Sequence, residues 1–174
     1  MELKDAIQLI THQEFSPKGK NNWADLGCGT GTFTLALASI LESDSSILAV
    51  DADQSALNKI PTGFNQITIS TQKADFVNDV LQARNLQGVL MANSLHFVKD
   101  KTTFLNKLKP YLAPNACFLV IEYDSDVANQ WVPHPVSFDA LNKLFSEASY
   151  KSIHKLNTRP SIYGNRNIYA SLIE

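Results

Sequence analysis

The sequence has few of the residues that mark extracellular, metal-binding or nucleic-acid-binding proteins. It contains only two cysteines, Cys28 and Cys117, which lie far apart and form no CxxC or Cys/His cluster. This usage predicts a reduced, cytosolic (cytoplasmic) protein with no structural metal. The formal net charge is only -2 at pH 7, which argues against a nucleic-acid partner. No apolar run reaches the length of a membrane span, and charged residues interrupt the first ten positions, so we expect neither a signal peptide nor a membrane partner.

The residues that are present indicate one globular unit. A chain of 174 residues that is 44% hydrophobic can bury one substantial core, which predicts a single domain over 1–174. We divide it into an N-terminal helix and linker (1–22), a central region (23–123) and a C-terminal loop and hairpin (124–174).

Short apolar runs alternate with stretches of helical periodicity along most of the chain. The expected strands are 23–26, 47–50, 66–70, 88–92 and 116–123, and the expected helices lie near 2–13, 31–42, 53–59, 76–84 and 101–109. This alternation is typical of βαβ units and predicts an α/β, doubly wound fold with a parallel sheet covered on both faces. After a helix near 137–148, strands near 151–156 and 167–173 have no helix between them, so they must pair as an antiparallel hairpin.

The stretch WADLGCGTGTF, residues 23–33, places three glycines between a strand and a helix. Backbone N–H groups of such a turn can approach a ligand closely at the positive end of the helix dipole. A tight turn with close helix–strand packing explains the same pattern, and both interpretations stay open. A dinucleotide-binding fingerprint would need glycine at position 32, where this sequence has Thr32.

Two acidic residues follow later strands. Asp51 ends the second strand about 20 residues after the glycines, where a carboxylate can accept hydrogen bonds from both hydroxyls of a ribose. Helix capping is the alternative, and Asp53 fits that role better. Asp75, followed by Phe76, can accept from an exocyclic amine while the ring packs on a purine. An N-cap and a core phenylalanine would look the same.

Taken together, DLGCGTG (25–31), AVDAD (49–53), ADF (74–76), MANSLHFVKD (91–100) and LKPYLAPNACFLVIEYD (108–124) resemble the class I S-adenosylmethionine (SAM)-dependent methyltransferases that act on small molecules. The resemblance implies a Rossmann-like, seven-stranded sheet of order 3-2-1-4-5-7-6 with an antiparallel last strand. It implies SAM as the cofactor and a small-molecule oxygen or nitrogen acceptor.

The resemblance also assigns cofactor-binding roles. The methionine part would meet Asp25, Gly27, Cys28, Gly29 and Gly31, the ribose Asp51 and Ala52, the adenine Asp75 and Phe76, and Asn93 would face the reactive side. The sequence departs from the family pattern where Pro114-Asn115 replaces a glycine pair, although asparagine tolerates left-handed dihedrals. Residues 93–96 read NSLH rather than the Pro-Pro-aromatic motif of nucleobase methylation, which again disfavours a nucleic-acid target.

Candidate residues for the chemistry are fewer. His96 could act as a general base, or it could shape the loop through backbone hydrogen bonds. His134 is a second candidate, whose alternative is a solvent-facing side chain in a rigid loop.

Cover for the substrate would come from the N-terminal helix, the 124–136 loop, the 157–166 connection or the second subunit of a homodimer. Aromatic and arginine side chains there could bind a planar, anionic molecule, because the guanidinium fork matches a carboxylate. The alternative is an ordinary hairpin with core aromatics and solvated arginines. The candidates are Trp131, Arg159, Tyr163 and Arg166.

Two function classes follow from the sequence. The first is an enzyme that methylates a small molecule, and the second is a catalytically inert binding or regulatory subunit that keeps the cofactor site. A nicotinamide-binding protein is a third alternative, which Thr32 disfavours.

Overall fold

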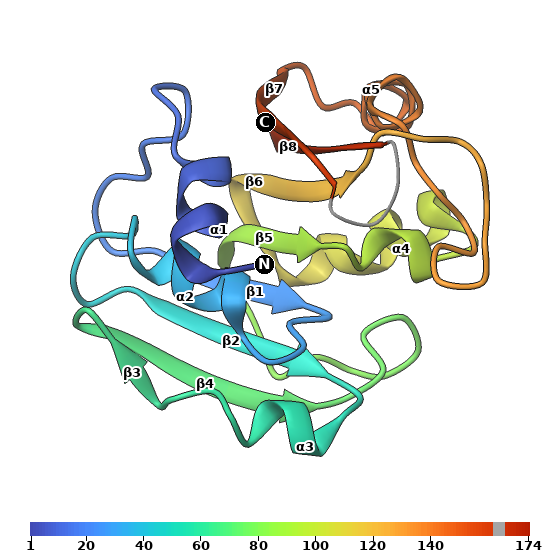
Figure 1. Cartoon of the computed structure of the whole chain (residues 1–174). Coiled ribbons are helices and arrows are strands. Elements are labelled where there is room, and N and C mark those ends of the chain that lie inside the picture. Colours follow the sequence, from blue (N-terminus) through green and yellow to red (C-terminus); the bar gives the residue numbers. More distant parts are fainter. Residues whose placement is uncertain (162–165) are drawn as a thin grey trace.

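The structure is a computed structural model in which residues 1–161 and 166–174 are described (Figure 1). Its centre is an eight-stranded sheet of order β3-β4-β2-β1-β5-β6-β8-β7. The strands are β1 (Asn22–Leu26), β2 (Ser46–Asp51), β3 (Gly63–Phe64), β4 (Ile67–Lys73), β5 (Leu86–Ala92), β6 (Leu112–Tyr123), β7 (Ile153–Pro160) and β8 (Asn167–Ile173). Apart from the short β3, this is the predicted order.

The direction of the strands also confirms the predicted fold class. Strands β4, β2, β1, β5 and β6 are parallel, and β8 inserts antiparallel between β6 and β7. The unpredicted β3 pairs antiparallel with β4. The turn between them consists of Asn65 and Gln66, whose φ values are 48° and 64°. Two residues with positive φ make the tight hairpin turn that matches strand twist. The usual sequence signal for it, a glycine in second position, is missing.

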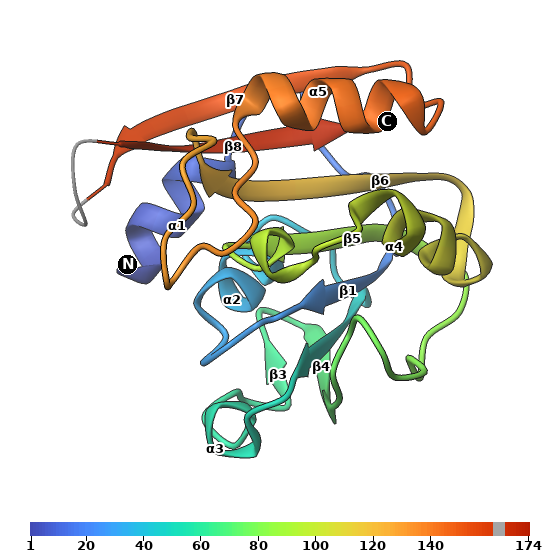
Figure 2. The same cartoon turned by 90° about the vertical axis from the view of Figure 1, so that its right-hand side faces the viewer.

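Helices cover both faces of the sheet, as Figures 1 and 2 show. One hydrophobic cluster joins the sheet to α1 (Leu3–Ile10), α2 (Thr32–Ala38) and α3 (Gln54–Leu57). A second cluster on the other face includes α4 (Lys101–Leu108) and α5 (Phe138–Glu147). Two short 3-10 turns, η1 (Leu95–Phe97) and η2 (Lys109–Tyr111), flank α4. The arrangement leaves the carboxyl ends of the parallel strands together at one edge of the sheet.

The predicted helix near 76–84 is wrong, because this segment is a series of turns. Side chains take the carbonyls that a helix would use. Lys107 Nζ donates to the carbonyls of Val77 (2.6 Å) and Asp79 (3.0 Å), and the Gln72 amide donates to a third carbonyl in the same stretch. Such side-chain bonds compete with the helical ladder, and apolar spacing alone does not reveal them.

The Pro114-Asn115 departure, expected before the last parallel strand, lies within that strand, and Asn115 adopts left-handed dihedrals there as predicted. Asn115 has φ = 62° and lies inside β6, so the asparagine adopts the left-handed conformation that glycine usually supplies. Within the described residues, no helix is long and apolar enough to cross a membrane.

Candidate functional site

The loop after β1 is folded back onto β2 by its own backbone. The N–H groups of Gly27 and Cys28 both donate to the Val50 carbonyl, at 2.8 and 3.0 Å. Gly27 has φ = 79°, and a Cβ there would lie 2.5 Å from the Ser94 Cβ. Close packing therefore accounts for this glycine. The Cys28 side chain joins the core beneath the loop, so only its backbone is available to a cofactor, and burial raises the pKa of its thiol.

The other two glycines of the motif differ from each other. Gly31 has φ = 87°, and a Cβ there would lie 2.8 Å from Ile60 Cγ1, so packing explains it as well. Gly29 has φ = 53°, and nothing lies within 4 Å of the Cβ position. The open side of the loop is therefore at Gly29. Both interpretations of the motif apply, at different glycines: packing at Gly31 and room for a ligand at Gly29.

Asp51 holds this loop in place. Its Oδ2 accepts from the Gly29 N–H at 2.8 Å, and its Oδ1 accepts from the Asp53 N–H at 2.9 Å. Each carboxylate oxygen can accept more than one hydrogen bond, so Asp51 can also receive two ribose hydroxyls. Asp53 caps α3 by accepting from the Ser55 N–H, as predicted.

Asp25 lies buried beneath the loop, with no exposed surface. Its Oδ2 accepts from the Thr34 hydroxyl at 2.6 Å, whereas no described residue bonds to its Oδ1. Burial raises the pKa of Asp25 from 3.8 to about 7, against the opposing hydrogen bond from Thr34, and the negative Asp51 adds to the rise. A buried carboxylate with an unpartnered oxygen suits a cationic ligand group such as the ammonium of SAM.

A groove of about 470 Å³ runs along the carboxyl ends of β1, β2 and β4. It brings together five predicted residues: Gly27, Asp51, Ala52, Asp75 and Phe76. Phe76 is buried and packs edge-on against Phe104, with ring centroids 5.8 Å apart. The sequence reasoning missed six further lining residues: Ala74, Val77, Asn78, Ser94, Phe97 and Lys99.

Asp75 is both a turn cap and a wall of the groove. Its Oδ1 accepts from the N–H groups of Val77 and Asn78, and its Oδ2 accepts from the Asn78 side-chain amide at 2.7 Å. These bonds lower the pKa of Asp75, led by the one from the Asn78 side chain. The carboxylate is thus kept ionised and exposed at the groove, as an acceptor for an adenine amine requires.

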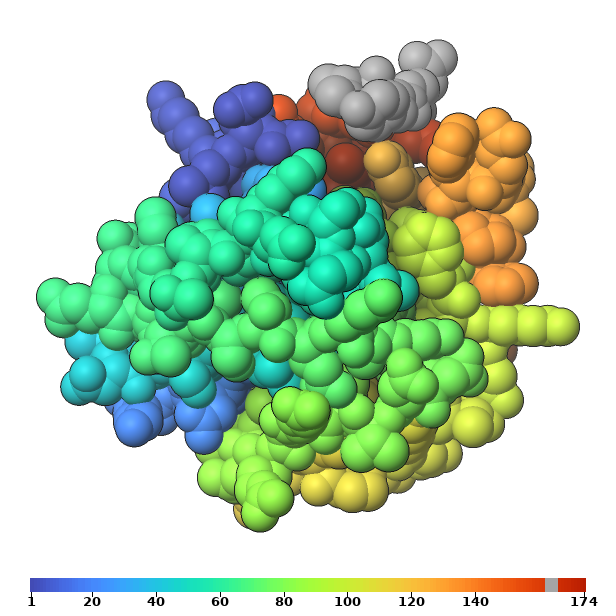
Figure 3. Space-filling model, turned by 90° about the horizontal axis from the view of Figure 1, so that it is seen from below, coloured from blue at the N-terminus to red at the C-terminus, as the bar shows by residue number. Residues whose placement is uncertain are grey.

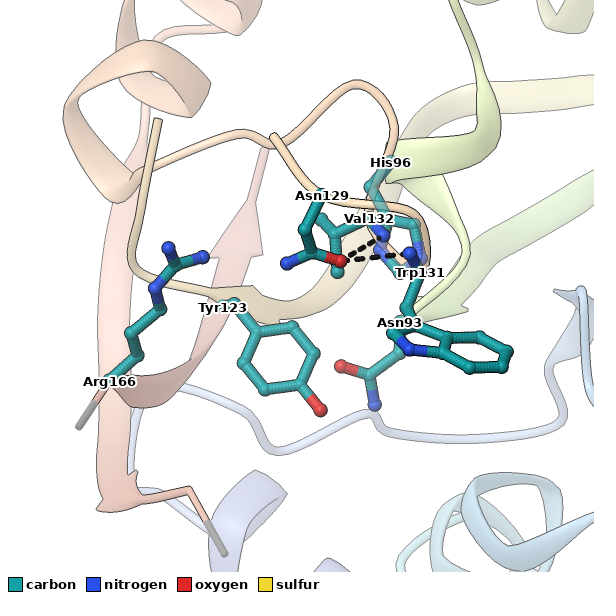
Figure 4. A pocket seen from close by; sticks show the side chains of 7 residues that line it. All are labelled: Asn93, His96, Tyr123, Asn129, Trp131, Val132 and Arg166. Atoms are coloured by element: carbon teal, nitrogen blue, oxygen red, sulfur yellow. Dashed lines mark hydrogen bonds between the residues drawn. The ribbon is translucent and has the colours of Figure 1, made fainter. Parts of the chain in front are cut away.

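A second cavity, of about 840 Å³, is lined by Asn93, the residue before Ser94. Its lining, drawn in Figure 4, consists of Asn93, His96, Tyr123, Asn129, Trp131, Val132 and Arg166. Asn93 directly follows β5 with φ = 53°, and its buried Oδ1 has no partner among the described residues. The consecutive residues Asn93 and Ser94 line the cavity and the groove respectively, so both reach the carboxyl end of β5. This junction is where a group could pass from cofactor to acceptor.

His96 is one half of a buried pair. Its Nδ1 lies 2.7 Å from Glu122 Oε2, and its backbone N–H donates to Glu122 Oε1 at 3.1 Å. The histidine is 3% exposed and the glutamate 1%. The sequence reasoning missed Glu122, although a single carboxylate inside the apolar strand β6 was the available signal. The carboxylate fixes the imidazole at the cavity wall.

Residues 124–136, which we call the roof segment, cover this cavity with Asn129, Trp131 and Val132. The His134 N–H donates to the His96 carbonyl at 3.1 Å, and the Lys101 ammonium donates to the His134 carbonyl at 2.8 Å. Figure 3 shows the orange roof segment beside the yellow-green segment after β5. His134 thus meets the site through its backbone and is not among the described residues that line the cavity.

The two remaining substrate candidates are Arg159 and Tyr163. Arg159, expected at the substrate mouth, lines a separate cleft beside α1, where its Nη1 is 3.1 Å from Asp5 Oδ2. Arg159 is therefore not among the described residues that line the cavity of Arg166, and its substrate role stays a prediction. Tyr163 lies outside the described residues.

A family model described as a methyltransferase domain matches residues 24–115, more than half of the chain, and the chain therefore belongs to this family. The groove fits the cofactor on independent grounds, because the carboxylates of Asp51 and Asp75 and the ring of Phe76 line it. Asp25 and Gly29 are not among the described residues that line it.

Comparisons with individual proteins agree with this membership. The O-methyltransferase cnsE of Penicillium expansum is 26% identical over 164 residues, a match covering 84% of this chain and 58% of that relative, so the chain spans less than two thirds of its length. The structure of a SAM dependent methyltransferase from Aquifex aeolicus shares 15% identity, covers 99% of this chain and 98% of that one, and has a TM-score of 0.65. The plantazolicin methyltransferase BpumL, solved in complex with SAH, shares 14% identity over 99% and 82% of the two chains, with a TM-score of 0.67. The two structural likenesses establish the fold.

Proposed function

We propose that this chain transfers the methyl group of SAM to a hydroxyl oxygen of a small molecule held in the larger cavity. The observation that carries the proposal is the buried His96–Glu122 pair at the cavity wall. A hydroxyl arrives protonated at neutral pH and needs a base, whereas an amine with a free lone pair does not. The Penicillium expansum relative is an O-methyltransferase by name, which supports oxygen over nitrogen.

The cofactor, when bound, supplies a methyl group already activated on a positively charged sulfur. The protein must hold it and orient the acceptor. Asp51 and Asp75 hold the nucleoside end through hydrogen bonds, and Asp25 compensates the charge of the amino-acid end. Phe76 provides an apolar wall for the base.

His96 is the group that would remove the proton. A carboxylate only accepts hydrogen bonds, so the Glu122 contact places the imidazole hydrogen on Nδ1 and leaves Nε2 as the acceptor. Nε2 would take the proton of the acceptor hydroxyl, and the oxygen freed of that proton would receive the methyl group that bound SAM would supply, leaving SAH. Glu122 then stabilises the imidazolium, which releases its proton to solvent. The roof segment limits the entry of water to the junction.

Turnover tests this proposal. Purified protein is incubated with SAM and a panel of hydroxylated small molecules, and release of SAH is measured. The inert-subunit alternative predicts SAM binding with no release above background for any member of the panel. The proposed enzyme gives release that depends on the acceptor.

Histidine variants then test the mechanism on whichever acceptor turns over. We expect His96→Gln to lower kcat by about 10²–10⁴-fold while SAH affinity stays within about twofold. Glu122→Gln should lower kcat less and move the acid limb of the pH profile, as a positioning residue would. His134→Gln is the matched control and should retain activity. A His96→Gln enzyme with unchanged kcat would remove the base from the mechanism.

A further inference from the structure

The two arginines near the predicted substrate mouth have different surroundings. Arg159 is paired with Asp5 beside α1, whereas Arg166 lines the acceptor cavity. The ion pairs among residues 1–161 and 166–174 do not include Arg166. Its Nη1 donates to the Val127 carbonyl at 3.1 Å, which leaves most of its guanidinium N–H groups without an acidic partner among those residues.

The acidic side chains of the roof segment, Asp124 and Asp126, bind groups other than Arg166. Asp124 accepts from the Phe138 N–H at 2.9 Å and pairs with Lys155 at 3.1 Å. Asp126 accepts from the Ser137 N–H at 3.2 Å. These carboxylates help to begin α5 rather than neutralise the arginine. A guanidinium at a cavity wall without its own carboxylate favours an anion on the ligand.

The cavity also separates this charge from the reactive end. In Figure 4, Tyr123 lies between Arg166 on one side and Asn93 with Trp131 on the other. The Trp131 indole is 75% exposed, and a solvated ring of that size at a cavity mouth offers a flat face to a ligand. The wall therefore presents, in order, a polar reactive end, aromatic surface and a cation.

We propose that the acceptor is a planar hydroxylated carboxylate, with Arg166 as the residue that selects its carboxylate. The hydroxyl faces His96, the ring lies along Tyr123 and Trp131, and the carboxylate meets the guanidinium fork. That the ligand accepts a methyl group rests on the proposed function, but its binding site can be tested without turnover.

Binding can be followed through Trp131. The only other tryptophan, Trp23, is 2% exposed in the core, so quenching by a cavity ligand reports mainly on Trp131. We would titrate the SAH-saturated protein with hydroxybenzoate, hydroxyphenylpropionate and hydroxycinnamate, each beside its primary amide. The three lengths sample the separation between His96 and Arg166, and each amide keeps the shape while removing the charge.

For at least one pair, the carboxylate should bind about tenfold or more tightly than its amide. Arg166→Gln should bring that ratio close to one, and Arg166→Lys should restore part of it. Arg159→Gln, the matched control, should leave the ratio unchanged. Thermal unfolding of each variant verifies that it is folded.

Two results would overturn the assignment. One is a carboxylate-to-amide ratio near one for all three pairs in the unchanged protein, including the case of no binding. The other is an Arg166→Gln variant that weakens both members of a pair equally, which would make the Val127 contact a purely structural one. Charge-selective binding without SAH release from SAM would leave this site intact and refute the proposed function instead.

Discussion

Replacing Asp25 by asparagine should make the protein without cofactor more stable and its cofactor site weaker. The carboxyl is fully buried, and its pKa rises from 3.8 to about 7 on folding, so the folded state binds the proton more tightly than the unfolded state. Stability contributed by this group is therefore lost as the pH rises from about 4 to about 7. A pKa difference of this size means that the ionised carboxyl lowers the free energy of unfolding by about 4 kcal/mol above pH 7 and by about 1–2 kcal/mol at about pH 5.

The asparagine removes this penalty but adds an amide N–H group where Asp25 Oδ1 has no partner, which costs about 1–2 kcal/mol. The net gain is about 2–3 kcal/mol at about pH 8.5 and close to zero at about pH 5. For a chain of this length it raises Tm by roughly 4–12 °C at the higher pH. Affinity for SAM should fall by about tenfold or more, because a charge-assisted contact is lost.

Thermal unfolding of both proteins at the two pH values, with calorimetric titration of SAM, measures all three quantities. A difference in Tm that is the same at both pH values would refute the reasoning, since a buried ionised carboxyl would then not be the cause. Asp25→Asn with unchanged SAM affinity would separate this residue from the cofactor.

Three further expectations concern the glycine loop after β1 and single residues in two strands. Gly27→Ala should destabilise the fold by about 2 kcal/mol or more, because its Cβ meets Ser94. Gly29→Ala should cost about 1 kcal/mol of stability through backbone strain, yet weaken SAM binding more than Gly27→Ala does. Denaturant unfolding and calorimetric titration of both variants would contradict this if Gly29→Ala were the less stable variant or Gly27→Ala the weaker binder. Asp51→Ala should weaken SAM binding by about 1–3 kcal/mol in a folded protein, and an unchanged Kd would mean that the ribose is misplaced. Asn115→Ala should cost about 1 kcal/mol of stability while Asn115→Gly does not, and equal losses in unfolding experiments would show that its positive φ is unimportant.

The order of the sheet could be predicted because the family resemblance implies it, whereas the apolar runs and the helix-free hairpin predict a parallel sheet with an antiparallel end. Asp51, Asp75 and Phe76 could be placed for a related reason. They follow consecutive parallel strands, and the carboxyl ends of such strands meet at one edge. A strand and the residue after it are local features, so they can be predicted from a short stretch of sequence.

Features that depend on distant partners could not be predicted. Glu122 becomes part of the site only because β6 lies beside β5 and turns it toward His96. The predicted helix near 76–84 is replaced by turns because Lys107, from another helix, takes its carbonyls. Arg159 and Arg166 read alike in sequence, and only the pairing register of β7 and β8 separates them.

The central claim is that the loop at Gly29, with Asp51 and the groove beyond it, forms a SAM site. Isothermal titration of the purified protein with SAM and with SAH tests it most directly. The account predicts saturable binding of both at one site per chain, with Kd values between about 1 µM and about 1 mM, which corresponds to about 4–8 kcal/mol. No detectable heat with either compound at low millimolar concentration would contradict it.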